Sequence, residues 1–75
     1  MARTDIRDIL AENLRAHRGK VGLSQDEFAA KSGLHRTYIG SIERSERNVT
    51  LATLELLAKA TGISIPMLLT RKNSS

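Results

Sequence analysis

The stretch from residue 24 to residue 44 constrains the fold more than any other part of the chain. Ser24 is followed three residues later by Glu27, which is the spacing of a capping box at the start of a helix. Gly33 then provides a residue that can adopt the left-handed backbone needed to end one helix and turn the chain sharply. A second helical pattern follows over residues 35–44. The stretch therefore predicts two short helices joined by a tight turn.

The second of these helices separates apolar from polar residues. At about 100° per residue, Ile39 and Ile42 lie on one side. The nearly opposite side, an arc of roughly 140°, carries small, hydroxyl and cationic residues: Arg36, Thr37, Gly40, Ser41 and Arg44. Such a strip fits the edges of base pairs better than bulk water, although each residue alone is equally consistent with an ordinary solvated face. We interpret residues 24–44 as a helix-turn-helix that reads DNA, with its second helix in the major groove.

The rest of the chain is organised by capping residues and apolar stripes. Four of the predicted helices begin at a residue whose side chain can cap the first turn: Thr4 or Asp5, Ser24, Thr50 and Ser64. Apolar stripes with three-to-four spacing mark the first and fourth helices: Ile6, Leu10 and Leu14, then Leu51, Leu54 and Leu57. The first helix should extend to about residue 18, and Gly62 should end the fourth. With no strand pattern, we expect an all-α, five-helix domain over residues 1–70 and a frayed polar tail over 71–75.

Composition excludes several functional classes. Without cysteine, the chain can form no disulfide, thiolate zinc site or cysteine nucleophile. His17, which we expect to be exposed on the first helix, and His35 lack partners at metal-ligand spacing, so we expect no metal and no cofactor. A chain of 75 residues also offers no obvious cleft for catalytic groups, and we do not expect an enzyme. No apolar run approaches the ~20 residues of a membrane span, and no signal-peptide pattern is present, which predicts a cytoplasmic protein with no membrane partner.

The positive charge is concentrated around the predicted helix-turn-helix. The chain has 12 basic and 8 acidic residues, for a net charge of +4. Between Arg15 and Arg47 there are seven basic and four acidic residues, and the remainder of the chain has five and four. The excess therefore lies where neutralisation of DNA phosphates would require it.

The candidate DNA contacts lie on and around the second helix of the motif. Arg36 is early on that helix, where a guanidinium can bond O6 and N7 of guanine, and Thr37 can offer a hydroxyl to a base. Gly40 would allow the helix to approach the groove closely. Further candidates for base or phosphate contact are Gln25, His35, Tyr38, Ser41, Arg44, Arg47 and Asn48. The alternatives are an ordinary helix residue for Gln25, a helix cap for His35, and a polar loop for Arg47 and Asn48.

Two further groups have predicted structural roles. Arg18 and Glu43 can form an ion pair that connects the first helix to the third. A patch of apolar residues near the C-terminus can form a self-complementary dimer interface: Ile63, Ile65, Met67 and Leu68. The alternative is that these residues cover the base of the protomer's own core. A two-fold dimer would require a near-palindromic site with half-sites about 34 Å apart or a multiple of that.

From residue 14 to residue 48 the chain resembles the lambda-repressor-like, Cro-type helix-turn-helix family, also called the XRE family. The resemblance is carried by Arg15, Arg18, Gly22-Leu23-Ser24-Gln25, Phe28-Ala29, Gly33 and residues 39–43. Within that family, residues 34–44 with Glu46-Arg47-Asn48 resemble the controller proteins of restriction–modification systems, which are small dimeric regulators. An antitoxin of the same fold, or a general XRE-type repressor, is the alternative.

The resemblance implies roles for individual positions. It implies phosphate contact at Gln25, base contact at Arg36 and Thr37, base or backbone contact at Tyr38 and Ser41, DNA contact at Arg47, and a buried ion pair between Arg18 and Glu43. It also implies dimerisation through the C-terminal helices, and RNA polymerase is a further candidate partner. One position departs from the family pattern. Ser45 stands where such proteins usually carry glycine after the recognition helix, and a left-handed backbone there costs serine more.

Overall fold

The computed structural model describes residues 5–71 and is entirely helical in its regular structure over that range. Its helices are α1 (Ile6–Val21), α2 (Gln25–Ser32), α3 (Arg36–Glu43), α4 (Leu51–Thr61) and α5 (Ile65–Leu68). The predicted all-α, five-helix fold is confirmed. Thr4, the alternative first cap, and residues 72–75 of the predicted tail lie outside the described residues.

Local capping sets the helix boundaries. Both halves of the capping box are formed at α2, since Ser24 Oγ accepts from the Glu27 N–H at 3.0 Å and Glu27 Oε1 accepts from the Ser24 N–H at 2.8 Å. The side chains of Asp5, Thr50 and Ser64 cap α1, α4 and α5. α1 continues beyond the predicted end near residue 18, because the left-handed backbone that ends it is supplied by Gly22 rather than Gly19.

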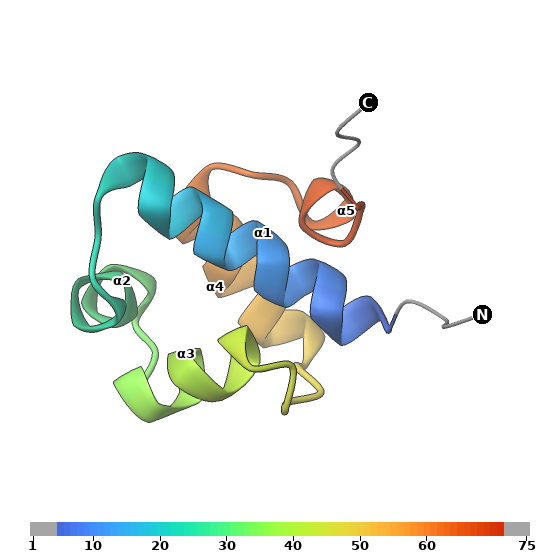
Figure 1. The fold of residues 1–75 in the computed structure, drawn as a ribbon, viewed down its shortest axis with the longest axis horizontal. Helices are drawn as coiled ribbons and strands as arrows, with labels where there is room; N and C mark the ends of the chain where they lie inside the picture. The colour runs from blue at the N-terminus through green and yellow to red at the C-terminus, as the bar shows by residue number, and fades with distance from the viewer. Residues whose placement is uncertain (1–4, 72–75) are drawn as a thin grey trace.

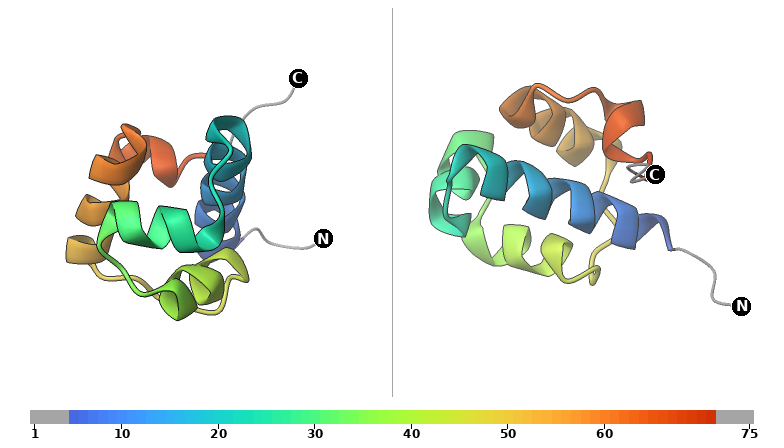
Figure 2. Two further views of the ribbon diagram at one scale, coloured as in Figure 1. Left: turned by 90° about the vertical axis from the view of Figure 1, so that its left-hand side faces the viewer. Right: turned by 45° about the horizontal axis from the view of Figure 1, so that its top comes forward.

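The helices are arranged around α1, the longest of them (Figure 1). α3 packs against α1 and α2, α4 packs against α2 and α5, and α5 packs against α1. The two further views show α3 and α5 on opposite sides of α1 (Figure 2). This arrangement presses one face of α3 onto α1 and α2 and leaves its other face on the molecular surface.

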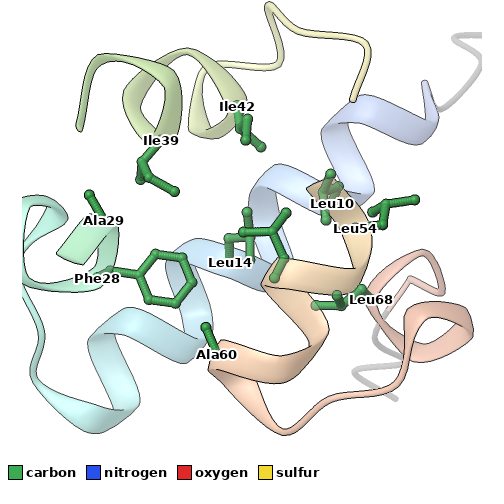
Figure 3. Packing of buried hydrophobic residues seen from close by; sticks show 10 residues of the cluster. Leu10, Leu14, Phe28, Ala29, Ile39, Ile42, Leu54, Ala60 and Leu68 are labelled. Carbon is green, nitrogen blue, oxygen red and sulfur yellow. The ribbon is translucent and has the colours of Figure 1, made fainter. Parts of the chain in front are cut away.

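The hydrophobic core draws on every helix (Figure 3). Its largest fully buried side chains are Leu14, Phe28, Ile39, Ile42, Leu57 and Leu68. The predicted stripes on α1 and α4 are wrong at their first positions, since Ile6 is 53% exposed and Leu51 is 76% exposed. Both residues occupy the first position of their helix, and each stripe becomes buried only from its second member onward, at Leu10 and Leu54.

The predicted interface patch is divided between core and surface. Leu68 is fully buried in the protomer's own core, so it offers no surface to a partner and its assignment to an interface is corrected. Ile63 and Ile65 are partly buried against the same core. Met67 is 60% exposed. The role of these last three residues in dimerisation stays a prediction.

His17 differs from the expectation of a solvated side chain. Its ring lies against Phe28, with centroids 6.2 Å apart, and its Nε2 atom is buried without a hydrogen-bond partner among residues 5–71. Burial lowers the pKa of His17 below its ordinary value of 6.5, and the nearby charges of Lys31 and Lys20 lower it further. No group of three metal-binding side chains occurs within the described part of the chain. None of the helices described is long and apolar enough to span a membrane.

Candidate nucleic-acid interface

A buried polar cluster at Glu43 fixes α3 to its two neighbours. Glu43 is the last residue of α3 and is 3% exposed. Arg18 of α1 donates from Nε to Oε2 and from Nη2 to Oε1, both at 2.8 Å, and Gln25 of α2 donates from Nε2 to Oε1 at 3.0 Å. Arg18 also donates to the carbonyl of Leu23 at 3.1 Å, and Arg15 donates to the carbonyl of Glu43 at 2.6 Å. The structure thus contains the expected Arg18–Glu43 ion pair within a larger network.

The network keeps Glu43 charged despite its burial. Burial alone raises the pKa of the carboxyl, but hydrogen bonds from Arg18 and Gln25 and the nearby arginine charges outweigh it, so the pKa of Glu43 is lowered. The hydrogen bond to Glu43 in turn raises the pKa of Arg18. Because its carboxylate is satisfied from α1 and α2 together, the end of α3 is held at a fixed position on the domain.

The first residue of α3 presents an exposed arginine. The Arg36 side chain is 60% exposed, and its Nε lies 3.0 Å from Oδ1 of Asp26, whose side chain is 75% exposed. Thr37 beside it is also exposed. His35 precedes them as the N-cap, with Nδ1 accepting from the Thr37 N–H at 3.2 Å, so the structure has it in its alternative role as a cap.

The glycine within α3 is covered by a neighbouring side chain. A Cβ atom at Gly40 would lie 3.1 Å from Nη1 of Arg44 and 3.7 Å from Oε1 of Gln25. The Arg44 side chain therefore passes over Gly40, and its Nε lies 3.2 Å from Oε1 of Glu46. Gly40 is buried in the described structure, so the expectation that it opens the helix surface to a groove is corrected. Its missing side chain makes room for an arginine.

Ser41 is turned into the protein. It is only 7% exposed, and its Oγ donates to the carbonyl of Tyr38 at 2.8 Å while accepting from Nε of Arg47 at 3.1 Å. The Arg47 guanidinium lies over the Tyr38 ring, with Cζ 4.8 Å from the centroid. The Tyr38 hydroxyl in turn lies 3.4 Å from Oγ1 of Thr53 in α4. With its only hydrogen used within α3, the Ser41 hydroxyl cannot donate to DNA in this conformation.

The backbone after α3 turns back toward the helix through Ser45. This residue has φ of 63°, the only positive φ at a non-glycine residue within the described range. Its N–H donates to the carbonyl of Ile42 at 3.0 Å, and the Glu46 N–H donates to the carbonyl of Ser41 at 2.9 Å. These two bonds form a Schellman ending with serine in the position that glycine usually occupies.

Several residues of this surface were not found from the sequence. Asp26 and Glu46, which pair with Arg36 and Arg44 at the two ends of α3, were not among the predicted site residues. Thr53, which contacts Tyr38, was not among them either. Asp26 and Thr53 come from α2 and α4, so no periodicity within α3 indicates them. The one available signal was the two-residue separation of Arg44 and Glu46.

Comparison with known proteins agrees with this geometry. A family model described as helix-turn-helix, HTH_3, matches residues 14–68. Control protein C.SmaI of Serratia marcescens is 63% identical over 68 residues, which cover 91% of this chain and 81% of that protein. The hypothetical transcription factor NHTF from Neisseria superposes with a TM-score of 0.84 at 40% identity, covering 89% of this chain and 77% of that one. The restriction–modification controller C.Esp1396I, solved as a tetramer with its natural 35 base-pair operator, superposes with a TM-score of 0.74 at 32% identity, covering 91% and 100%. The chain belongs to the HTH_3 family of helix-turn-helix proteins.

Proposed function

We propose that this chain is the controller of a restriction–modification system, a transcription regulator that binds a near-palindromic DNA operator as a homodimer. The observation that carries the proposal is the exposed start of α3 on a helix whose other end is fixed by Glu43. Its similarity to C.SmaI, and to a controller solved on its operator, supports the same assignment. Its family is one of DNA-binding regulators, and we place its action at bacterial DNA in the cytoplasm.

Arg36 is the residue we assign to base reading. As the first residue of α3 it projects from the end that enters deepest into a major groove. Its guanidinium can exchange the Asp26 carboxylate for O6 and N7 of a guanine, which together accept two hydrogen bonds from an arginine. Thr37, the exposed neighbour, offers a hydroxyl and a methyl group to the adjacent base.

Phosphate contacts are assigned to residues that flank α3. Gln25 uses one amide hydrogen on Glu43, which leaves the second for a phosphate at the N-terminal end of α2. Arg44, Arg47 and Asn48 are exposed at and beyond the other end of α3 and can grip the backbone there. His35 can approach phosphate only in addition to its capping role.

Footprinting and titration on the DNA upstream of the chain's own gene test the function. We expect the parent to protect two half-sites related by an approximate two-fold axis. Arg36→Ala should weaken binding to that duplex by about 1–3 kcal/mol and relax the preference at one guanine in each half-site.

The control is Arg71→Ala, which removes the same charge from a residue that follows α5, a helix on the other side of α1 from α3 (Figure 2). It should leave the preference for the upstream duplex over a scrambled one unchanged. If Arg36→Ala binds both duplexes as tightly as the parent, α3 is not the reading helix. If the parent itself does not discriminate between them, the regulatory function is wrong.

A further inference from the structure

The Arg47 side chain is held on two sides before any DNA is present. Its Nε donates to Ser41 Oγ at 3.1 Å, and its guanidinium lies over the Tyr38 ring at 4.8 Å from the centroid. An arginine within about 6 Å of an aromatic centroid is attracted to the face of the ring. The hydrogen bond and the ring together restrict the rotamers of a side chain that is otherwise among the most flexible.

The groups that hold Arg47 are themselves fixed. Ser41 is buried, and its hydroxyl hydrogen is committed to the carbonyl of Tyr38 at 2.8 Å, so its lone pairs face the arginine. The Tyr38 hydroxyl reaches Thr53, which also accepts from the side chain of the α4 cap, Thr50, at 3.1 Å. The arginine therefore rests on α3 and, through Tyr38, on the first turn of α4.

The guanidinium of Arg47 differs from those of the other arginines on this surface in the partner of its Nε. In Arg36 and Arg44 the Nε atom lies beside a carboxylate, of Asp26 and Glu46 respectively, whereas in Arg47 it donates to a neutral hydroxyl and leaves the positive charge unpaired by any carboxylate within residues 5–71. Within residues 5–71, no hydrogen bond or ion pair involves Nη1 or Nη2 of Arg47, whose side chain is exposed. A planar guanidinium whose Nε is satisfied and whose two amino groups make no hydrogen bond within residues 5–71 is suited to a phosphate oxygen pair.

We propose that Ser41 is a positioning residue that acts on DNA through Arg47, holding its guanidinium with Tyr38 for one phosphate of the backbone. The inference rests on the proposed function only for the identity of the ligand, since the positioning exists in the free protein. Ser41 makes no base contact, and its contribution to binding is carried entirely by the arginine. Its effect is therefore independent of sequence, because phosphates carry no sequence information.

A double-mutant cycle on the full chain separates this role from direct contact. Ser41→Ala should weaken binding by about fivefold per half-site, the value of one modest hydrogen bond, on both the upstream duplex and a scrambled duplex. Arg47→Ala should weaken binding more and lower the slope of log affinity against log salt by about one for each half-site. In the Arg47→Ala background, Ser41→Ala should have no further effect.

Two controls sharpen the cycle. Arg47→Lys keeps the charge but lacks the Nε donor and the planar group, so Ser41→Ala should also be silent in that background. Arg44→Ala removes a cation that does not touch Ser41. In the Arg44→Ala background, Ser41→Ala should still weaken DNA binding by the full factor of about fivefold per half-site. Equal losses from Ser41→Ala in all backgrounds, or a loss confined to the upstream duplex, would overturn the proposal.

An NMR measurement tests the positioning without DNA. In the free parent, the Arg47 Nε–H resonance should exchange with solvent at least about fivefold more slowly than in Ser41→Ala, because one hydrogen bond is lost. The two proteins should unfold at similar urea concentrations, since alanine is well tolerated within a helix. If Arg47 Nε–H exchanges equally fast in both proteins, Ser41 does not position it. That result would stand even if DNA binding by the parent failed.

Discussion

Glu43 is the residue on which the position of α3 most depends, because its carboxylate joins side chains from α1 and α2. Arg18 and Gln25 occupy its two oxygens almost completely, and little of the group reaches solvent. A buried pair of this kind contributes modest net stability, but removing one partner leaves an uncompensated charge. The network therefore fixes the position of α3, and removing one of its members lowers the stability of the protein.

Glu43→Gln should lower the free energy of unfolding by about 3 kcal/mol at neutral pH, because the Arg18 side chain, 22% exposed, loses its counter-charge. Urea melts measure this directly. The matched control is Glu12→Gln, since Glu12 pairs with Arg71 at the surface with 46% of its side chain exposed and should cost less than about 0.5 kcal/mol. Equal losses in the two variants would mean that the Glu43 pair is solvated.

The same residue predicts the acid response. The pKa of Glu43 is lowered in the folded state, so its unfolded form takes up a proton first as pH falls. The stability that it contributes is present above its ordinary value of 4.5 and is lost as pH falls through the lower folded pKa. Glu43→Gln should therefore show a shallower loss of stability below pH 4.5 than the parent.

At the scale of single residues, the sequence predicted a charged partner for Arg18 but not the further hydrogen bonds that the ion pair makes. Glu43 was identifiable as that partner, whereas nothing in the spacing placed Gln25 beside it. The exposure of Ser41 was predicted wrongly for a related reason. Helical periodicity predicts an exposed position for it, but in the structure it is buried, and Arg47 from the loop beyond α3 donates to its hydroxyl.

At the scale of helices, prediction succeeded where the determinants are local. Caps at Ser24, Thr50 and Ser64 fix where helices begin, because each capping side chain bonds to the backbone only three residues away. The ends of apolar stripes were predicted less well, since exposure at Ile6 and Leu51 depends on whether another helix reaches that turn. The start of each helix is thus determined by nearby residues, whereas the burial of a side chain depends on other helices.

Ser45→Gly should raise the stability of the protein by up to about 1 kcal/mol, since the left-handed backbone at φ of 63° costs a residue with Cβ more than it costs glycine. The shift in urea midpoint at constant slope provides the measurement. Ser24→Gly makes the same change at φ of −74° and removes a cap, so it should lower stability by a few tenths of a kcal/mol. A loss of stability in Ser45→Gly would contradict the left-handed ending of α3.

At the scale of the whole molecule, the predicted dimer interface lies on the face next to α5. Ile63 and Ile65 already pack against the protomer's core, so a charge at either position would damage the fold and any interface together. Met67 is 60% exposed and can be altered without opening the core. It is therefore the member of the predicted patch that can report on assembly.

We expect the parent to sediment as a dimer and Met67→Asp to sediment as a monomer at the same concentration, because an isolated carboxylate is costly to bury in an apolar interface. Its helical circular dichroism should match that of the parent. Val21→Asp is the matched control, since Val21 is 47% exposed at the end of α1 that points away from α5 (Figure 1). It should sediment as the parent does. A dimeric Met67→Asp would place the interface elsewhere on the surface.

The carboxylates beside Arg36 and Arg44 have a consequence for how a regulator finds its site. On arbitrary DNA, an arginine already facing a carboxylate displaces fewer condensed counterions, so it adds little to sequence-independent retention. A guanine in the right place would offer Arg36 two acceptors in exchange for Asp26, and we expect the exchange to be favourable only there. We therefore expect the protein to stay bound longer on its own site than on unrelated sequence.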